Sequence, residues 1–191
     1  VAQRTSELVA TRQQIIRRLG RAAEFKDNET GNHVVRMSHI SRLIAQQAGM
    51  GPEAVQLLFQ TAALHDVGKI GVPDSILLKP GRLDEEETRL MRLHSQKGFD
   101  ILRSIPNDAA AAVAQVALHH HEAADGSGYP AGLRGEEIPV LARVVAVDDH
   151  GVEVPPAPHM LVVNNDDRPG VIGVVGAVAY VAALVVQSRR G

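Results

Sequence analysis

Apolar residues recur every three to four positions through most of the first 150 residues, which is the period of amphipathic helices. The pattern predicts helices over residues 5–26, 32–50, 52–66, 83–102, 109–121 and 139–150. Gly51 and Pro52 separate two of these helices, and residues 71–81 and 125–132 have the Gly, Pro and Asp content of turns and loops. We therefore expect this part of the chain to be mainly α.

The pattern changes after His150. Residues 151–157 are rich in Pro and predict a linker, and residues 160–163 form a short β-branched run with the period of a strand. A Pro-Gly turn then leads into a helical pattern over residues 171–186. The expected fold is a mainly α bundle followed by a short C-terminal βα segment.

The amino-acid composition limits which residues can form the core and which partners the chain can bind. Apolar residues make up 45% of the chain but aromatic residues only 3%, so the core must consist mainly of Leu, Ile, Val and Ala. A net charge of -2 gives no general basic surface for duplex nucleic acid. The absence of cysteine excludes disulfides and thiolate ligands, and is compatible with a reducing cytoplasm.

Two features bear on export and membranes. The chain starts with a charged segment and without a signal peptide, so we expect a cytoplasmic protein. Residues 169–188 carry no charge and are long enough to cross a bilayer. Their Gly and Ala content and the initial Pro-Gly favour a turn and a short helix instead, so a membrane is not an expected partner.

Histidine and carboxylate residues gather at predicted helix ends. His65 and Asp66 are adjacent, and an Asp carboxylate can bridge two cations where a neutral His cannot. Taken alone, this pair also fits a surface His beside a helix-terminal Asp. Further residues of these types occur at comparable positions, which favours a site for two or three divalent cations. The candidate ligands are Glu29, His33, His65, Asp66, His94, His120, His121 and Asp149.

Several segments together resemble the HD-GYP subgroup of the HD phosphohydrolases. The resemblance covers residues 13–149, and its motifs are residues 29–33, 65–69, 94, 120–122, 125–130 and 142–147. It implies that residues 27–150 form a metal-dependent phosphohydrolase domain in which the eight candidate residues are metal ligands. Asp66 would bridge two metals and Glu29 would serve a third, with iron or manganese as the expected metals.

The resemblance also implies a substrate and roles for other residues. The substrate would be cyclic di-GMP or a related cyclic dinucleotide. Lys69 lies one turn from the predicted ligands, so we expect its charge to act with Asp66 in catalysis; the alternative is a solvated surface lysine. The loop that contains Gly126, Gly128, Tyr129 and Pro130 would control substrate access and contact diguanylate cyclase domains. Tyr129 is either a stacking surface or an anchor of this loop.

The two ends of the chain resemble other segments. Residues 1–26 resemble the helical linker that joins receiver domains to HD-GYP outputs in response regulators, and this helix is also a candidate homodimer surface. Residues 158–176 resemble the start of an ACT domain of the phosphoglycerate dehydrogenase type, so residues 158–191 would be a partial ACT-like segment. The usual C-terminal helix of the HD-GYP family is missing, and Asp148 and Ala124 replace its usual Ala and Trp.

The expected function is hydrolysis of a cyclic dinucleotide in bacterial signal transduction by a metal-dependent phosphodiesterase. Two alternatives remain open at this point. One is a nucleotide phosphohydrolase of the wider HD superfamily, which would not need the loop around Tyr129. The other is a catalytically silent binding module that keeps the fold and the loop.

Overall fold

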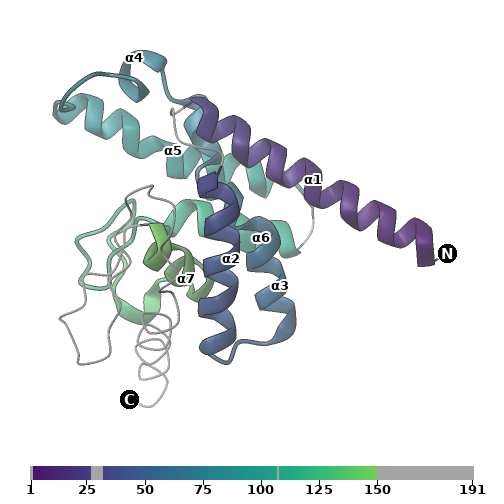
Figure 1. The fold of residues 1–191 in the computed structure, drawn as a ribbon. Helices are drawn as coiled ribbons and strands as arrows, with labels where there is room; N and C mark the ends of the chain where they lie inside the picture. The colour runs from purple at the N-terminus through teal and green to yellow at the C-terminus, as the bar shows by residue number, and fades with distance from the viewer. Residues whose placement is uncertain (1, 27–31, 107, 150–191) are drawn as a thin grey trace, which may run out of the picture.

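A computed structural model describes residues 2–26, 32–106 and 108–149, and these residues form a bundle of helices (Figure 1). The mainly α fold predicted from the sequence is therefore confirmed. The elements, with 3₁₀ helices written η, are α1 (Ala2–Lys26), α2 (Asn32–Gln47), α3 (Pro52–Thr61), η1 (Ala62–Leu64), η2 (Val67–Gly71), α4 (Asp74–Leu77), α5 (Glu85–Arg103), α6 (Asp108–His119), η3 (Gly135–Glu137) and α7 (Val140–Asp149).

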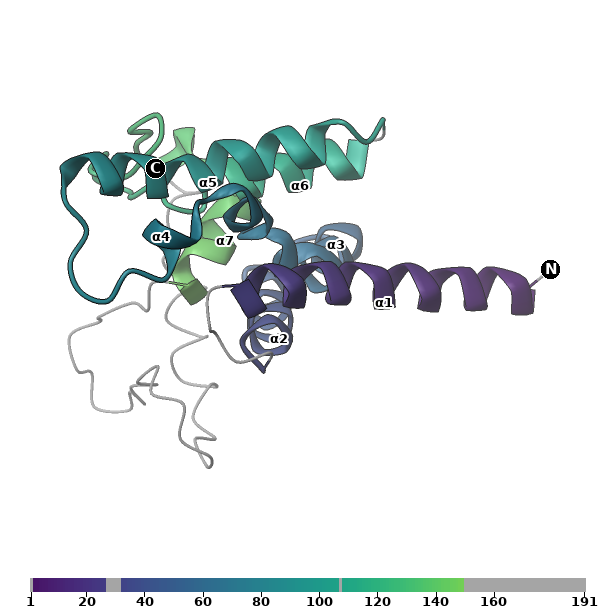
Figure 2. The ribbon, with the colours of Figure 1, turned by 90° about the horizontal axis from the view of Figure 1, so that it is seen from above.

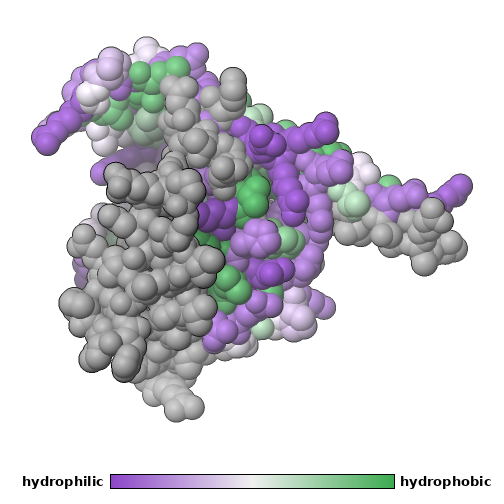
Figure 3. All heavy atoms as spheres, viewed as in Figure 1, coloured by the Kyte–Doolittle hydropathy of each residue, from purple (hydrophilic) through white to green (hydrophobic). Residues whose placement is uncertain are grey.

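The core is aliphatic, as the composition predicts. One cluster lies where α2 packs against α3 and α7, and includes the buried residues Met37, Leu58 and Val144. A second cluster lies between α5, α6 and the η1–η2 segment, and includes Leu64 and Val113. Hydrophilic residues cover most of the coloured part of the visible face of α2 and of the C-terminal half of α1, whereas apolar ones form smaller groups, for example over α4 (Figure 3). Many aliphatic side chains are thus buried between the helices, although some large ones, such as Leu8 and Ile15 on α1, are exposed.

Two glycines bring η2 against α5. A Cβ atom on Gly68 would lie 1.9 Å from the carbonyl oxygen of His94 and 2.4 Å from the amide nitrogen of Gly98. A Cβ atom on Gly98 would lie 3.3 Å from the Cβ of Ala117 on α6. Because neither glycine has a side chain, η2 and α5 pack backbone to backbone at this point, and the Ala117 side chain of α6 packs closely on Gly98. This contact places the chain segment before η2 beside the middle of α5.

The helix α1 has two different halves. Its N-terminal half projects away from the other helices in both ribbon views (Figures 1 and 2). Its C-terminal half packs on η1 and η2, where Gly20 lies so close to Ala63 that a Cβ atom would come within 2.6 Å of the Ala63 carbonyl oxygen. Ala23 is buried in the same contact.

Three predicted helix ends are wrong by a few residues. The helix predicted to reach Asp66 ends as an α-helix at Thr61, whose hydroxyl donates to the Leu57 carbonyl at 2.6 Å, a contact that bends helices. The helix predicted to reach residue 50 ends at residue 47, because Gly49 has φ +67 and reverses the chain. The third, α6, ends at His119.

The end of α6 has its own cause. The carbonyl oxygen of His121 accepts from the backbone N–H of Tyr129 at 3.1 Å, so the chain beyond α6 pairs with the following loop.

The turn-rich segment 71–81 contains the short helix α4, and the segment 125–132 is a loop as predicted.

Some predictions fall outside the described residues. These are the linker, strand and helix expected over residues 151–191, the ACT-like segment among them, and the position of Glu29. In the part of the chain that the structure describes, no helix combines the length and the apolar character needed to cross a membrane.

Candidate metal centre

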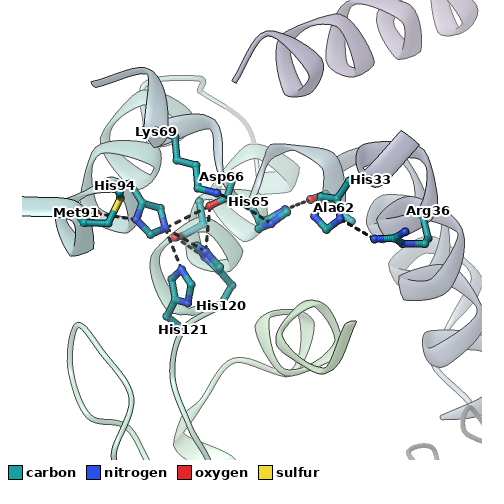
Figure 4. A network of polar contacts seen from close by, with 11 residues as sticks. His33, Arg36, Ala62, His65, Asp66, Lys69, Met91, His94, His120 and His121 are labelled. Atoms are coloured by element: carbon teal, nitrogen blue, oxygen red, sulfur yellow. Dashed lines mark hydrogen bonds and ion pairs between the residues drawn. The ribbon is translucent and has the colours of Figure 1, made fainter. Parts of the chain in front are cut away.

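Four predicted ligands converge in the interior, from three separate parts of the fold (Figure 4). Asp66 lies between η1 and η2, His94 lies in α5, and His120 and His121 directly follow α6. One ligand atom from each lies within 4.8 Å of the other three. His94 is only 2% exposed, so it is not an ordinary solvated side chain. His65 lies beside this group.

Asp66 is at the centre of the contacts. Its Oδ1 atom is 3.3 Å from His94 Nε2 and 3.5 Å from His120 Nε2, while its Oδ2 atom is 3.3 Å from His65 Nε2. The Lys69 ammonium lies 2.8 Å from the same Oδ2 atom, and its side chain is 16% exposed. Both carboxylate oxygens of Asp66 therefore face imidazole or ammonium nitrogen atoms. Lys69 is mostly buried and is not a solvated surface lysine.

Three of the histidines are held in the same way. The Nδ1 atoms of His65, His94 and His120 each lie 2.8 to 3.0 Å from the carbonyl oxygen of the residue three positions earlier. Because a carbonyl only accepts, Nδ1 carries the proton and donates it. In the neutral rings the lone pair is then on Nε2, the atom that faces the cluster. This orientation is the one that metal-binding histidines adopt through their outer hydrogen bonds.

The donor set fits divalent cations. His94 Nε2 lies 3.4 Å from His120 Nε2 and 3.0 Å from His121 Nε2, so ring nitrogens crowd around the Asp66 carboxylate. Lone pairs of neutral rings this close repel one another unless a positive charge lies between them. Imidazole nitrogen and carboxylate oxygen together suit first-row divalent metals, and no thiolate is present to favour softer ions.

Electrostatics favour the ligand forms of these groups. Burial alone would raise the pKa of Asp66, but the positive charge of a protonated His65, and the hydrogen bonds that His120, His65 and His94 donate from Nε2 when their rings are protonated, bring this pKa well below its usual range. Burial lowers the pKa of His120, and this effect outweighs the opposing one of Asp66. Near neutral pH the site therefore combines a carboxylate with a neutral imidazole, which are the forms that bind metals.

The remaining predicted ligands differ from this group. His33 on α2 lies with its ring centroid 6.2 Å from that of His65, and its Nδ1 is 3.2 Å from an Arg36 guanidinium nitrogen. Since a guanidinium only donates, Nδ1 of His33 accepts, and the proton of a neutral ring is on Nε2. Glu29 lies outside the described residues, and of Asp149 only the helical backbone is described. Their roles as ligands stay predictions.

The loop after His121 forms one rim of the site. The buried carboxylate of Glu122 accepts from the backbone N–H groups of Ala131 at 2.8 Å and Leu133 at 3.0 Å, and so ties the loop back to its start. The Tyr129 ring stacks on the His121 ring with centroids 4.6 Å apart. Gly128 has no room for a side chain, because a Cβ atom would lie 2.2 Å from a backbone nitrogen.

The turn at the start of this loop is held locally. Asp125 accepts at its Oδ1 atom from the backbone N–H of Ser127 at 2.9 Å and from the Ser127 hydroxyl at 2.6 Å. These hydrogen bonds lower the pKa of Asp125. Gly126 has φ +82, a backbone conformation that favours glycine, and Pro130 follows Tyr129 in the loop.

Sequence reasoning missed several residues that shape the site. Glu122 stands in a recognised motif, directly after the histidine pair, and that position was the only signal of its role as a clamp. Arg92, two residues before the predicted ligand His94, places its guanidinium carbon 4.8 Å from the Tyr129 ring centroid. The contact of Gly98 with Gly68 depends on the packing of two elements, and no local pattern indicates it.

Known proteins support the same class of site. The HD domain family matches residues 6–151, which is most of the chain, and the chain therefore belongs to this family. Its relatives confirm the resemblance to the HD-GYP subgroup. The chain is 45% identical over 144 residues to the cyclic di-GMP phosphodiesterase response regulator RpfG of Xanthomonas campestris, a match that covers 75% of this chain and 38% of that protein.

Two further relatives show the range of named substrates. The chain is 43% identical over 136 residues to a cyclic di-GMP phosphodiesterase of Thermotoga maritima, covering 71% of this chain and 37% of that protein. It is 36% identical over 143 residues to the 3'3'-cGAMP-specific phosphodiesterase 2 of Vibrio cholerae, a match that covers 75% of this chain and 27% of that protein. The chain thus spans little more than a third of the length of these curated relatives, or less.

Proposed function

We propose that this chain is the catalytic part of a metal-dependent phosphodiesterase that hydrolyses cyclic di-GMP or a related cyclic dinucleotide in bacterial signal transduction. The main observation is that ligand atoms of the buried Asp66, His94 and His120 and of the half-buried His121 lie within 4.8 Å of one another. The names of the relatives support the substrate class, because they act on cyclic di-GMP or 3'3'-cGAMP.

Asp66 and the histidines would hold two divalent cations, with Asp66 between them. Their mixed nitrogen and oxygen donors suit iron or manganese, the metals that the HD-GYP resemblance implies. Such cations, when bound, lower the pKa of water and neutralise negative charge on phosphate oxygens. Glu29, His33 and Asp149 would complete the ligand set, and Glu29 would serve a third cation.

The chain's own residues would orient the substrate and stabilise charge. Lys69 has its ammonium beside Asp66, where it can donate to a phosphate oxygen that gains charge in the transition state. The loop with Gly126, Gly128, Tyr129 and Pro130 would border the substrate and exclude water. Its closed shape depends on the Glu122 carboxylate.

Other parts of the prediction are proposals of the same kind. The relative that is a response regulator supports a role downstream of a receiver domain. The loop would contact diguanylate cyclase domains, and α1 would form a homodimer. The protein would be cytoplasmic. These three proposals rest on the sequence alone.

The decisive experiment compares the wild-type chain with Asp66→Asn. A neutral amide cannot bridge two cations, so the variant should lose most bound metal, and turnover should fall by roughly 10³-fold or more. Elemental analysis and hydrolysis of cyclic di-GMP, 3'3'-cGAMP and linear nucleotides are measured on both proteins. Cleavage of linear nucleotides alone would favour a general nucleotide phosphohydrolase, and a metal-loaded wild-type chain without turnover would favour a silent binding module.

A further inference from the structure

Lys26 is the last residue of α1, and its ammonium group lies against the end of η2. Its Nζ atom is 3.4 Å from the carbonyl oxygen of Lys69, 2.9 Å from that of Ile70 and 2.5 Å from that of Val72. The Asp74 carboxylate lies 3.3 Å away. One side chain of α1 thus contacts four oxygen atoms on the segment that follows Asp66.

These contacts meet a specific need of a short helix. The last carbonyl groups of a helix have no partner within it and need donors from elsewhere. A lysine ammonium has three N–H donors and can serve several carbonyl oxygens at once. On the α5 side, Lys97 donates to the carbonyl oxygen of Gly71. The carbonyls of residues 69 to 72 are therefore capped by two lysines, from α1 and from α5.

The position of η2 decides the position of two site residues. Asp66 is the residue directly before η2, and Lys69 lies within it. On one side η2 is fixed by the backbone contact of Gly68 with α5. On the other side η2 contacts α1, and Lys26 contributes hydrogen bonds to the η2 backbone there. Without the Lys26 ammonium, η2 would lose these hydrogen bonds to α1, and Asp66 and Lys69 could shift relative to the histidines.

We propose that Lys26 is a positioning residue of the metal centre, which acts through η2 on Asp66 and Lys69. The segment predicted to be a linker is then, at its C-terminal end, a structural part of the site. The effect on turnover rests on the proposed function, but the effect on metal binding does not.

The chain contains no cysteine, which allows a chemical test with little change in the protein. Lys26→Cys introduces a single thiol that bromoethylamine converts to thialysine, an ammonium side chain of nearly the same length. Iodoacetamide converts the same thiol to a neutral amide of similar bulk. Arg21→Cys, at an exposed position of the same helix, is treated in parallel as the matched control.

Two quantities are measured on each folded protein, with folding checked by circular dichroism. The first is the affinity for Co²⁺, followed by its visible absorption during titration. The second is kcat and KM with cyclic di-GMP. Loss of an outer contact of a metal site typically costs about 10-fold to 100-fold in metal affinity or activity. We expect Co²⁺ affinity and kcat of Lys26→Cys to fall by about 10-fold, with KM nearly unchanged.

The rescue separates positioning from general stability. Aminoethylation should restore Co²⁺ affinity and kcat to within about threefold of wild type, as estimated for an intact outer contact. The neutral amide should restore neither quantity. The Arg21→Cys protein, with its thiol free, aminoethylated or amidated, should keep the Co²⁺ affinity and kcat of the wild type. If Lys26→Cys does not fold, aminoethylation is done in denaturant before refolding, and the same rescue is expected.

Equal Co²⁺ affinity in Lys26→Cys and Arg21→Cys would overturn the proposal, and so would equal rescue by the neutral amide. A wild-type chain that binds Co²⁺ without hydrolysing any cyclic dinucleotide would contradict the proposed function alone. In that case the Co²⁺ affinities still decide the role of Lys26.

Discussion

The inner part of the site and its rim are held by different kinds of contact. In the inner part, three histidine rings are fixed by hydrogen bonds to backbone carbonyls, and η2 meets α5 backbone to backbone at Gly68. At the rim, the loop after His121 is held by the Glu122 carboxylate and by the Tyr129 ring stacked on His121. The inner contacts join separate packed helices, whereas the rim is a single loop that side-chain contacts and its own backbone hydrogen bonds tie to the end of α6.

This difference separates two tasks. Metal ligands must keep their geometry within a fraction of an ångström, and backbone contacts between packed helices provide that rigidity. A loop that admits a substrate must open, and a few side-chain contacts allow it to do so at low cost. We therefore expect changes in the inner part to affect metal binding, and changes at the rim to affect mainly substrate binding, except at Tyr129, whose ring contacts the predicted ligand His121.

The largest effect is expected for Gly68→Ala. The new Cβ would meet the His94 carbonyl oxygen at 1.9 Å, so η2 must move away from α5 and take Asp66 with it. Overpacking of this kind costs about 1–3 kcal/mol, and often more where backbone has to shift. Stability from urea unfolding, metal content and turnover should all fall.

Gly51→Ala is the control for this change, because Gly51 has φ -62 and nothing lies within 4 Å of its Cβ position. It should alter stability by less than about 1 kcal/mol, the usual cost of this substitution at a helix N-terminus. If Gly68→Ala kept a wild-type metal content, the backbone contact with α5 would not be what positions Asp66.

The same difference explains what the sequence could predict. Helical periodicity located the main helices, and the adjacency of His65 and Asp66 indicated the centre of the site. These signals are local. The end of α3 at Thr61 was missed, because the three residues that follow it are good helix formers and a side-chain hydrogen bond ends the helix. The contacts of Lys26 with η2 link residues more than 40 positions apart, and no local pattern indicates them.

A second prediction concerns Lys69, at the boundary of the two regions. Its ammonium lies beside Asp66 Oδ2, but a lysine is not a metal ligand when it is charged. Lys69→Ala should reduce kcat by roughly 10²-fold to 10³-fold, as for the loss of one charge-stabilising group, while bound metal stays constant. Parallel elemental analysis and steady-state kinetics check this. A wild-type kcat would remove Lys69 from catalysis, and metal loss would place it in the inner part.

At the rim, Glu122→Gln should weaken the loop. Glutamine offers one oxygen where the carboxylate offers two, so the N–H of Ala131 or Leu133 loses its acceptor. An unsatisfied polar group costs about 1–3 kcal/mol, which is enough to favour an open loop. We expect KM to rise by about 10-fold with unchanged metal content. Glu86→Gln, at an exposed ion pair with Arg89 on α5, should leave both unchanged.

The smallest effect is expected for Tyr129, where two roles are open. As an anchor, the ring would hold His121 through the stacked contact at 4.6 Å, and Arg92 would hold the ring in turn. As a stacking surface, it would contact a base of the substrate. Aromatic pairs contribute about 0.5–1.5 kcal/mol, which corresponds to about a twofold to tenfold change in affinity.

Tyr129→Leu removes the ring and keeps an apolar side chain, while Tyr129→Phe keeps the ring. The structure favours the anchor, because the Tyr129 ring stacks directly on the His121 ring. We therefore expect Tyr129→Leu to weaken Co²⁺ binding by about threefold to tenfold and Tyr129→Phe to leave it unchanged, since only the former loses the aromatic pair. A rise in KM at constant Co²⁺ affinity would instead assign the ring to the substrate. In that case the rim would reach the metal ligands through the backbone after α6 alone, and the separation of the two regions would be sharper.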